Sequence, residues 1–161
     1  MSDKKTNYEG FDLRMALVDA VPVLLFLAGG ILLFCKLGSP VFLAGALFST
    51  AAGACKVAWK FVLALRKKDA AVLPKLFRVL MPTGFVLMLL SVFLSAAAWG
   101  ALVRSLLAMP SLVFLLLGCA GILLMTVFAF RLDKNDPRSN WLEQFTNAAA
   151  QAMFLLALLL A

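Results

Sequence analysis

The hydrophobic pattern divides the chain into five apolar segments separated by short polar stretches. The segments cover about residues 13–34, 41–65, 80–103, 111–130 and 141–161. Each approaches the roughly 20 residues that an α-helix needs to cross the hydrocarbon layer of a membrane. Turn-forming residues at Gly38-Ser39-Pro40, Pro74 and Pro110 fall between segments. The pattern predicts an all-α integral membrane protein, a bundle of five transmembrane helices in a single domain over 1–161.

The last segment carries a weaker signal than the other four. Its second half is fully apolar, but its first half contains four polar side chains, Glu143, Gln144, Asn147 and Gln151. A helix from Asn140 to the end of the chain would reach about 33 Å, which is just enough to cross. We expect it to cross; a helix that lies along the surface or re-enters the membrane would leave four spans.

Composition excludes most other classes of protein. Hydrophobic residues make up 64% of the chain and charged residues 14%, against roughly 45–50% and about 25% in soluble domains. The chain contains no histidine, and its three cysteines are not paired at the spacing of metal ligands. We therefore expect neither a metal nor a cofactor.

The net charge of +7 matches a membrane topology better than a nucleic-acid site. The amino-terminal tail together with Arg14 contains 3 basic residues, and the four stretches between successive segments contain 1, 5, 1 and 3. Such alternation places the amino terminus in the cytoplasm and the carboxyl terminus outside. The small, compact design fits a bacterial inner membrane. No basic stretch has the interleaved aromatic residues of a nucleic-acid platform, so we expect no nucleic-acid partner.

Polar groups from three segments are expected at a similar depth in the cytoplasmic half. Asp19 lies about 9 Å into its segment, Lys60 and Lys56 lie about 7 and 13 Å from the cytoplasmic end of theirs, and Asn147 lies about 10 Å past Asn140. Ionisable groups at such depths are costly and often functional. We therefore expect Asp19 to form an ion pair with Lys56 or Lys60.

Further polar residues of the last segment lie on the same helical face as Asn147. Glu143, Asn147 and Gln151 recur at every fourth position and share one face of a helix. The predicted ligand or ion-pair site therefore contains Asp19, Lys56, Lys60, Glu143, Asn147 and Gln151.

Each of these residues also has a purely structural interpretation. The two lysines can extend the positive interface, and Asp19 can serve only as a structural partner. Glu143 fits a capping box with Asn140 as the helix cap, although Asp136-Pro137 offers a competing helix start. Interhelical hydrogen bonds alone would account for the amides.

Two further patterns concern packing and the membrane surface. Gly45, Ser49 and Gly53 form a stripe with Lys56, which predicts close helix contacts and a central position for the second segment. The loop after that segment is basic and partly apolar, so we expect it to lie on the inner leaflet and bind anionic lipid headgroups. Its basic residues are Arg66, Lys67, Lys68, Lys75 and Arg78.

Three function classes remain. The first is a small transporter or transporter subunit, in which binding of a charged amphipathic or anionic substrate, or of a proton, displaces an internal ion pair. The second is a non-catalytic scaffold, assembly or sensor protein, in which the same residues only hold helices together. No catalytic motif occurs, so an enzyme is the least favoured class. Because a chain of this length cannot enclose a wide pore alone, conduction would require a homo-oligomer or a larger membrane complex.

Overall fold

The computed structural model describes residues 13–66, 70–132 and 136–161, which form six α-helices. In chain order these are α1 (Leu13–Leu37), α2 (Pro40–Arg66), α3 (Val72–Leu94), α4 (Ala96–Leu106), α5 (Ser111–Arg131) and α6 (Pro137–Leu160). Among the described residues, α1, α2, α3 and the part of α5 up to Phe128 are long and apolar enough to cross a membrane. Many of their large apolar side chains are exposed, such as Phe93 at 80%. Together these features indicate an integral membrane protein.

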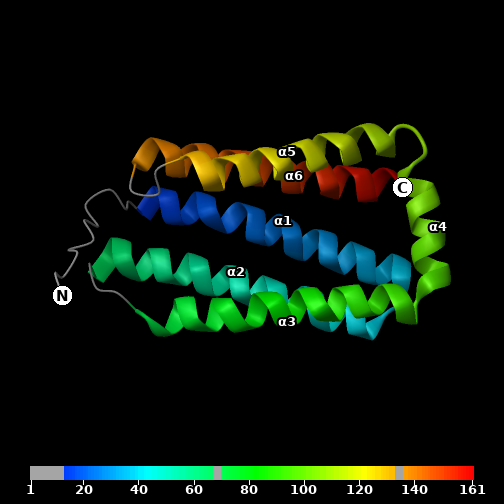
Figure 1. Ribbon diagram of the computed structural model, residues 1–161, viewed down its shortest axis with the longest axis horizontal. Coiled ribbons are helices and arrows are strands. Elements are labelled where there is room, and N and C mark those ends of the chain that lie inside the picture. Colours follow the sequence, from blue (N-terminus) through cyan, green and yellow to red (C-terminus); the bar gives the residue numbers. More distant parts are fainter. Residues whose placement is uncertain (1–12, 67–69, 133–135) are drawn as a thin grey trace.

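The long helices run side by side, and α4 lies across one end of them (Figure 1). Helix α1 packs against both α2 and α6, while α3 packs on α2 and α5 packs on α6. The spatial order is therefore α3–α2–α1–α6–α5. The prediction that the second segment is central was wrong, because α1 occupies that place. The small-residue stripe of α2 does not face one neighbour: Gly45 and Ser49 meet Gly84 of α3, whereas Gly53 meets Val23 of α1.

A glycine and a serine form the turn between α1 and α2. Gly38 has a φ of 61°, and its amide donates to the Phe34 carbonyl over 2.8 Å. This left-handed conformation is the usual way to end a helix, and glycine adopts it without strain. Ser39 Oγ then accepts from the Phe42 amide at 3.4 Å. The turn ends one helix and caps the next within three residues, which makes α1 and α2 antiparallel neighbours.

The third apolar segment is not one helix. It begins at Val72, and Ser95, with φ −129° and ψ 38°, breaks it into α3 and α4. The break lets α4 turn its apolar face onto the end of the bundle, where Leu102 is buried with Phe42 and Leu158. Trp99 fixes the corner: its Nε1 donates to Ser91 Oγ at 3.3 Å. Burial of the apolar face of α4 favours the break over a continuous helix. The span predicted at 80–103 was therefore wrong at both ends, since α3 covers Val72–Leu94.

Helices α5 and α6 approach closely at small residues. A Cβ at Gly121 would lie 2.7 Å from Ala150 Cβ, and one at Gly118 would lie 2.9 Å from the Phe154 ring. At the far end, Ser111 Oγ donates to the Ala157 carbonyl over 2.6 Å. Small side chains and interhelical hydrogen bonds are the usual means of helix association in lipid.

Helix α6 starts earlier than the apolar pattern indicates. Asp136 is its cap: the carboxylate accepts from the Arg138 amide at 3.3 Å and from the Ser139 amide at 3.0 Å. The alternative capping box, with Asn140 as cap and Glu143 as its partner, was wrong. Asn140 instead lies inside the first turn, where its Nδ2 donates to the Asp136 carbonyl.

This cap makes the stability of α6 depend on pH. Hydrogen bonds from the Ser139 hydroxyl and amide hold the pKa of Asp136 below its ordinary value. A lowered folded-state pKa adds stability above the unfolded value of about 3.9, and that stability is lost as pH falls through the folded-state pKa. We expect Asp136→Ala to lower the thermal midpoint at neutral pH, and the gap to the unmodified protein to close on acidification.

The control for the pH effect is Asp136→Asn. Asparagine caps helices about as well as aspartate but does not titrate. Its thermal midpoint should stay near that of the unmodified protein at neutral pH and lack the acid-dependent part. A gap between Asp136→Ala and the unmodified protein that persists unchanged through the acid titration would contradict the assignment.

Candidate functional site: an ion pair beside a membrane groove

A buried ion pair joins the first two helices. Lys60 Nζ of α2 lies 3.0 Å from Asp19 Oδ2 of α1, and each side chain is only 7% exposed. The sequence predicted that Asp19 pairs with Lys56 or Lys60, and the structure pairs it with Lys60. In low dielectric, such a pair is tolerable only when both charges stay together and further polar groups satisfy them.

Gln144 of α6 supplies that further polar group. With its amide oxygen turned toward α2, it accepts from Lys60 Nζ at 3.0 Å, and its nitrogen donates to the Met15 carbonyl at 3.0 Å. Gln144 is 4% exposed. The ammonium group of Lys60 therefore joins α1, α2 and α6 at the middle of the row of helices.

Sequence reasoning left Gln144 out of the predicted site. The signal was present, because Gln144, Asn147 and Gln151 are spaced i, i+3, i+7 and share a face as well as Glu143, Asn147 and Gln151 do. The structure selects the face of Gln144. Glu143 is half-buried and lines neither of the two cavities.

A polar cavity of about 300 Å³ adjoins the ion pair. All five long helices contribute to its wall. Its charged and amide side chains are Asp19, Lys56, Asn147 and Gln151. Lys56 is exposed, and no ion pair from it occurs within the described residues. The two lysines thus have different environments: Lys60 is buried beside Asp19, and Lys56 stands at the cavity.

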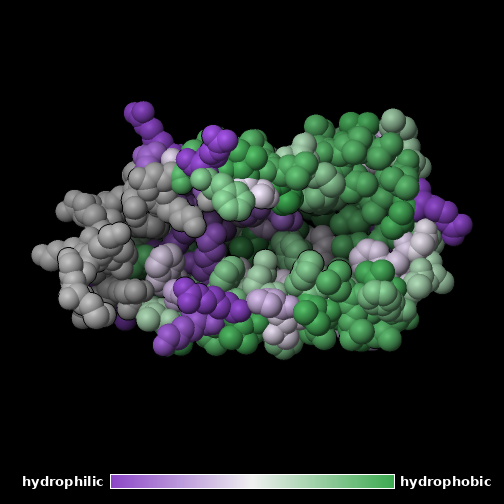
Figure 2. Space-filling model, in the orientation of Figure 1, coloured by the Kyte–Doolittle hydropathy of each residue, from purple (hydrophilic) through white to green (hydrophobic). Residues whose placement is uncertain are grey.

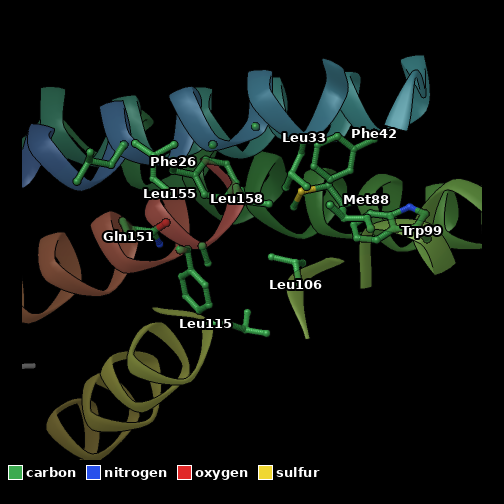
Figure 3. Close-up of a pocket in the computed structure, with 16 residues that line it drawn as sticks. Phe26, Leu33, Phe42, Met88, Trp99, Leu106, Leu115, Gln151, Leu155 and Leu158 are labelled. Carbon is green, nitrogen blue, oxygen red and sulfur yellow. The ribbon is translucent and has the colours of Figure 1, made fainter. Parts of the chain in front are cut away.

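A second, apolar cavity of about 320 Å³ adjoins the first on the side toward α4. The two share Phe26 and Gln151. Figure 3 shows Gln151 among apolar side chains that converge from α1, α4, α5 and α6, with Trp99 farther along the cavity. Sequence analysis did not predict this half, since it is made of ordinary apolar residues that only the tertiary arrangement brings together.

Together the two cavities form one groove along α1. Helices α3 and α5 bound it on opposite sides (Figure 1). The space-filling view shows the hollow between apolar surfaces, with hydrophilic atoms deep in the half away from α4 (Figure 2). The groove therefore changes from polar to apolar along its length.

Three of the five predicted headgroup residues lie where α2 ends and α3 begins. Arg66 ends α2, and Lys75 and Arg78 lie in the first turns of α3; all three side chains are exposed. Lys67 and Lys68 lie outside the described residues. The segment predicted as a loop at 66–78 is therefore helical from Val72 onward. Lys75 and Arg78 project from a helix rather than from a loop.

Comparisons of this chain with protein-family models, with curated proteins and with solved structures found no match. No group of three or more acidic or cysteine side chains placed to hold a metal occurs in the described ranges. The site offers one exposed ammonium group, two amides and a neutralised ion pair beside the apolar cavity.

Proposed function

We propose that this protein is a small membrane transporter, or a subunit of one, that binds an amphipathic anionic molecule in the groove. The observation that carries this proposal is that the polar and apolar cavities adjoin at their shared residues Phe26 and Gln151. Sites for small molecules are concave and mostly apolar, with a few polar groups that orient the ligand. Ionisable groups in membrane helices are costly, and those that face a cavity typically mark substrate or ion pathways.

We further propose five crossings, with the amino terminus in the cytoplasm, the carboxyl terminus outside and a bacterial inner membrane as the location. Helix α6 has 24 residues, about 36 Å, and lies beside α5. The bundle end where α1, α3 and α6 begin carries more basic residues than the opposite end (Figure 1). In the described part of the chain, the first end has Arg14, Arg66, Lys75, Arg78, Arg131 and Arg138, and the opposite end has Lys36 and Arg104. The positive-inside bias supports this orientation.

The proposed mechanism uses the ion pair as a closed state. Asp19 both lines the polar cavity and neutralises Lys60. An anionic group bound at Lys56 competes with Asp19 for the ammonium group of Lys60, which draws Lys60 toward the ligand. Because Lys60 joins α1, α2 and α6, its release would loosen the centre of the bundle and favour a second arrangement of the helices.

One observation favours a second candidate function, a non-catalytic scaffold. Lys60, Asp19 and Gln144 are buried, and Lys60 contacts both of the other side chains without any ligand. In that case a helix of another membrane protein would fill the groove, and the polar residues would only hold helices together.

Access of water to the polar cavity separates the two functions. In a background with all three native cysteines replaced by alanine, Asn147→Cys should react with a membrane-impermeant maleimide added to the cytoplasmic face of vesicles. Alkylation requires a thiolate, which forms only where water or a cation stabilises it. The matched control is Leu63→Cys, because Leu63 is 0% exposed on α2 and its thiol should stay unreactive. Labelling at position 147 no faster than at position 63 would overturn the transport proposal and favour the scaffold.

A further inference from the structure

We infer that the groove accommodates a lipid molecule with one anionic head and one long apolar chain, its head at Lys56 and its chain extending along α1 toward Trp99. This inference rests on the proposed function and specifies its substrate class. Four observations lead to it: the direction of the polarity change, the positive charge of Lys56, the dimensions of the groove and its closed far end.

The polarity change fixes the direction of the ligand. The polar half is lined by Lys56, Asp19 and Asn147, and the apolar half contains no charged side chain. A charged group in the apolar half would lose its hydration without gaining a partner, which is strongly unfavourable. The head must therefore lie in the half nearer the amino-terminal end of α1.

The charge at that end favours an anion. Asp19 neutralises Lys60 at 3.0 Å. Lys56 forms no ion pair within the described residues, so it places a positive charge in the wall of the polar cavity. The amides of Asn147 and Gln151 line the same cavity and can donate hydrogen bonds to an oxyanion. A cationic head would meet repulsion here, and a neutral head would leave Lys56 without a counter-charge.

The size of the groove matches one chain. On α2, Lys56 lines the polar cavity and Phe42 lines the apolar one, and a separation of 14 residues corresponds to about 21 Å along a helix. One leaflet of the hydrocarbon layer is about 15 Å thick, so the groove is long enough for an extended lipid chain. Its apolar part, about 320 Å³, is at the lower end of the range for ligand pockets, which favours one chain over two.

Helix α4 closes the far end. Trp99, Leu102 and Leu106 line the apolar cavity there, and the nearby Arg104 is exposed and absent from its wall. The side between α3 and α5 stays open along the groove (Figure 2). A lipid can therefore enter sideways from the membrane. Of its two possible orientations along the groove, only the one with the head at Lys56 places the charge beside polar groups.

Trp99 offers a direct readout of chain position. The experiment uses the full chain in nanodiscs of phosphatidylcholine, with Trp59→Phe and Trp141→Phe so that Trp99 is the single fluorophore. The probe is a fatty acid brominated near its methyl end, because bromine quenches tryptophan only on contact. The alcohol with the same brominated chain is the neutral probe. We expect saturable quenching by the acid, with half-saturation at about a tenfold lower concentration than for the alcohol, which is typical of a charge-assisted contact.

Two pairs of variants test the head and the chain separately. Lys56→Gln should remove the preference for the acid, whereas Lys75→Gln, an exposed basic residue outside the groove, should retain it. Gly29→Leu should abolish saturable quenching, because Gly29 lines the apolar cavity and a Cβ there meets only Leu158 at 3.8 Å. Gly100→Leu is its control, since nothing lies within 4 Å of a Cβ at Gly100.

The outcomes decide the inference independently of the proposed function. Quenching that does not saturate, or that persists in Gly29→Leu, would mean collision with bulk lipid and would overturn it. A preference for the acid that survives Lys56→Gln would overturn the placement of the head. In either case rapid maleimide labelling at position 147 would leave the transport proposal standing with a substrate of another class, whereas slow labelling would remove that proposal itself.

Discussion

Replacement of Lys60 with methionine is expected to lower the free energy of unfolding by about 3–5 kcal/mol, because removal of one member of a buried pair leaves the other uncompensated. Lys60 Nζ is 3.0 Å from Asp19 Oδ2, with both side chains 7% exposed. Methionine keeps the length of the side chain but cannot neutralise the carboxylate. Gln144 would also lose its contact with the ammonium group.

The double variant Asp19→Leu/Lys60→Met should be more stable than Lys60→Met alone. Two apolar side chains replace both charges, and such replacements are often neutral or even stabilising in buried sites. The measurement is reversible unfolding in mixed micelles for both single variants and the double variant, since only the full cycle isolates the interaction between the two residues. Lys56→Met is the matched control, because Lys56 is exposed on the same helix and should change stability little.

Additive losses in this cycle would mean that the two charges do not stabilise each other. A large loss for Lys56→Met would show instead that any lysine at this depth is required for insertion. If the cycle is as expected, each charge is stabilised by the other, and the proposed transport mechanism requires such a coupling.

The depths of Asp19 and the two lysines in the membrane were enough to predict an ion pair. Which lysine pairs with Asp19 depends on the direction in which each side chain points. Asp19, Lys56 and Lys60 were expected at similar depth, and helix periodicity places the two lysines on one face. Only the packing of α2 shows that Lys60 turns into the junction with α1 and that Lys56 stands at the cavity. A single sequence gives the rotation of a helix only to within the width of its polar face, which is too coarse to choose between residues one turn apart.

The helix ends show the same limit. Apolar length predicted α1, α2 and α5 closely, since the membrane sets a minimum span. It was wrong about α3 and α4, because Ser95 and the run of alanines that follows look compatible with a continuing helix. The break is stabilised by contacts of Trp99 and Leu102 with residues distant in sequence. Likewise, the cap at Asp136 depends on side-chain hydrogen bonds, whereas hydrophobicity alone starts the helix four residues later.

The α2–α3 interface should be least tolerant of an added side chain where Gly45 and Gly84 meet. A Cβ at Gly84 would meet Ser49 Oγ and would lie 2.7 Å from the Gly45 carbonyl oxygen and 2.8 Å from the Ser49 amide nitrogen. A Cβ at Gly45 would meet backbone atoms of α3 at similar distances. Backbone atoms cannot rotate away, so any added side chain must push the two helices apart.

We therefore expect Gly84→Ala to lower the free energy of unfolding by about 1–3 kcal/mol and Gly84→Leu to lower it further, measured by the same micelle unfolding. Gly100→Ala is the control with the opposite sign. Nothing lies within 4 Å of a Cβ at Gly100 on α4, and alanine is favoured over glycine by up to about 1 kcal/mol within a helix. Equal stability of Gly84→Ala and the unmodified protein would mean that α2 and α3 do not meet at their backbones. Since α3 is one wall of the groove, Gly84→Leu should also widen the groove, so that a variant that still folds would give faster maleimide labelling at position 147.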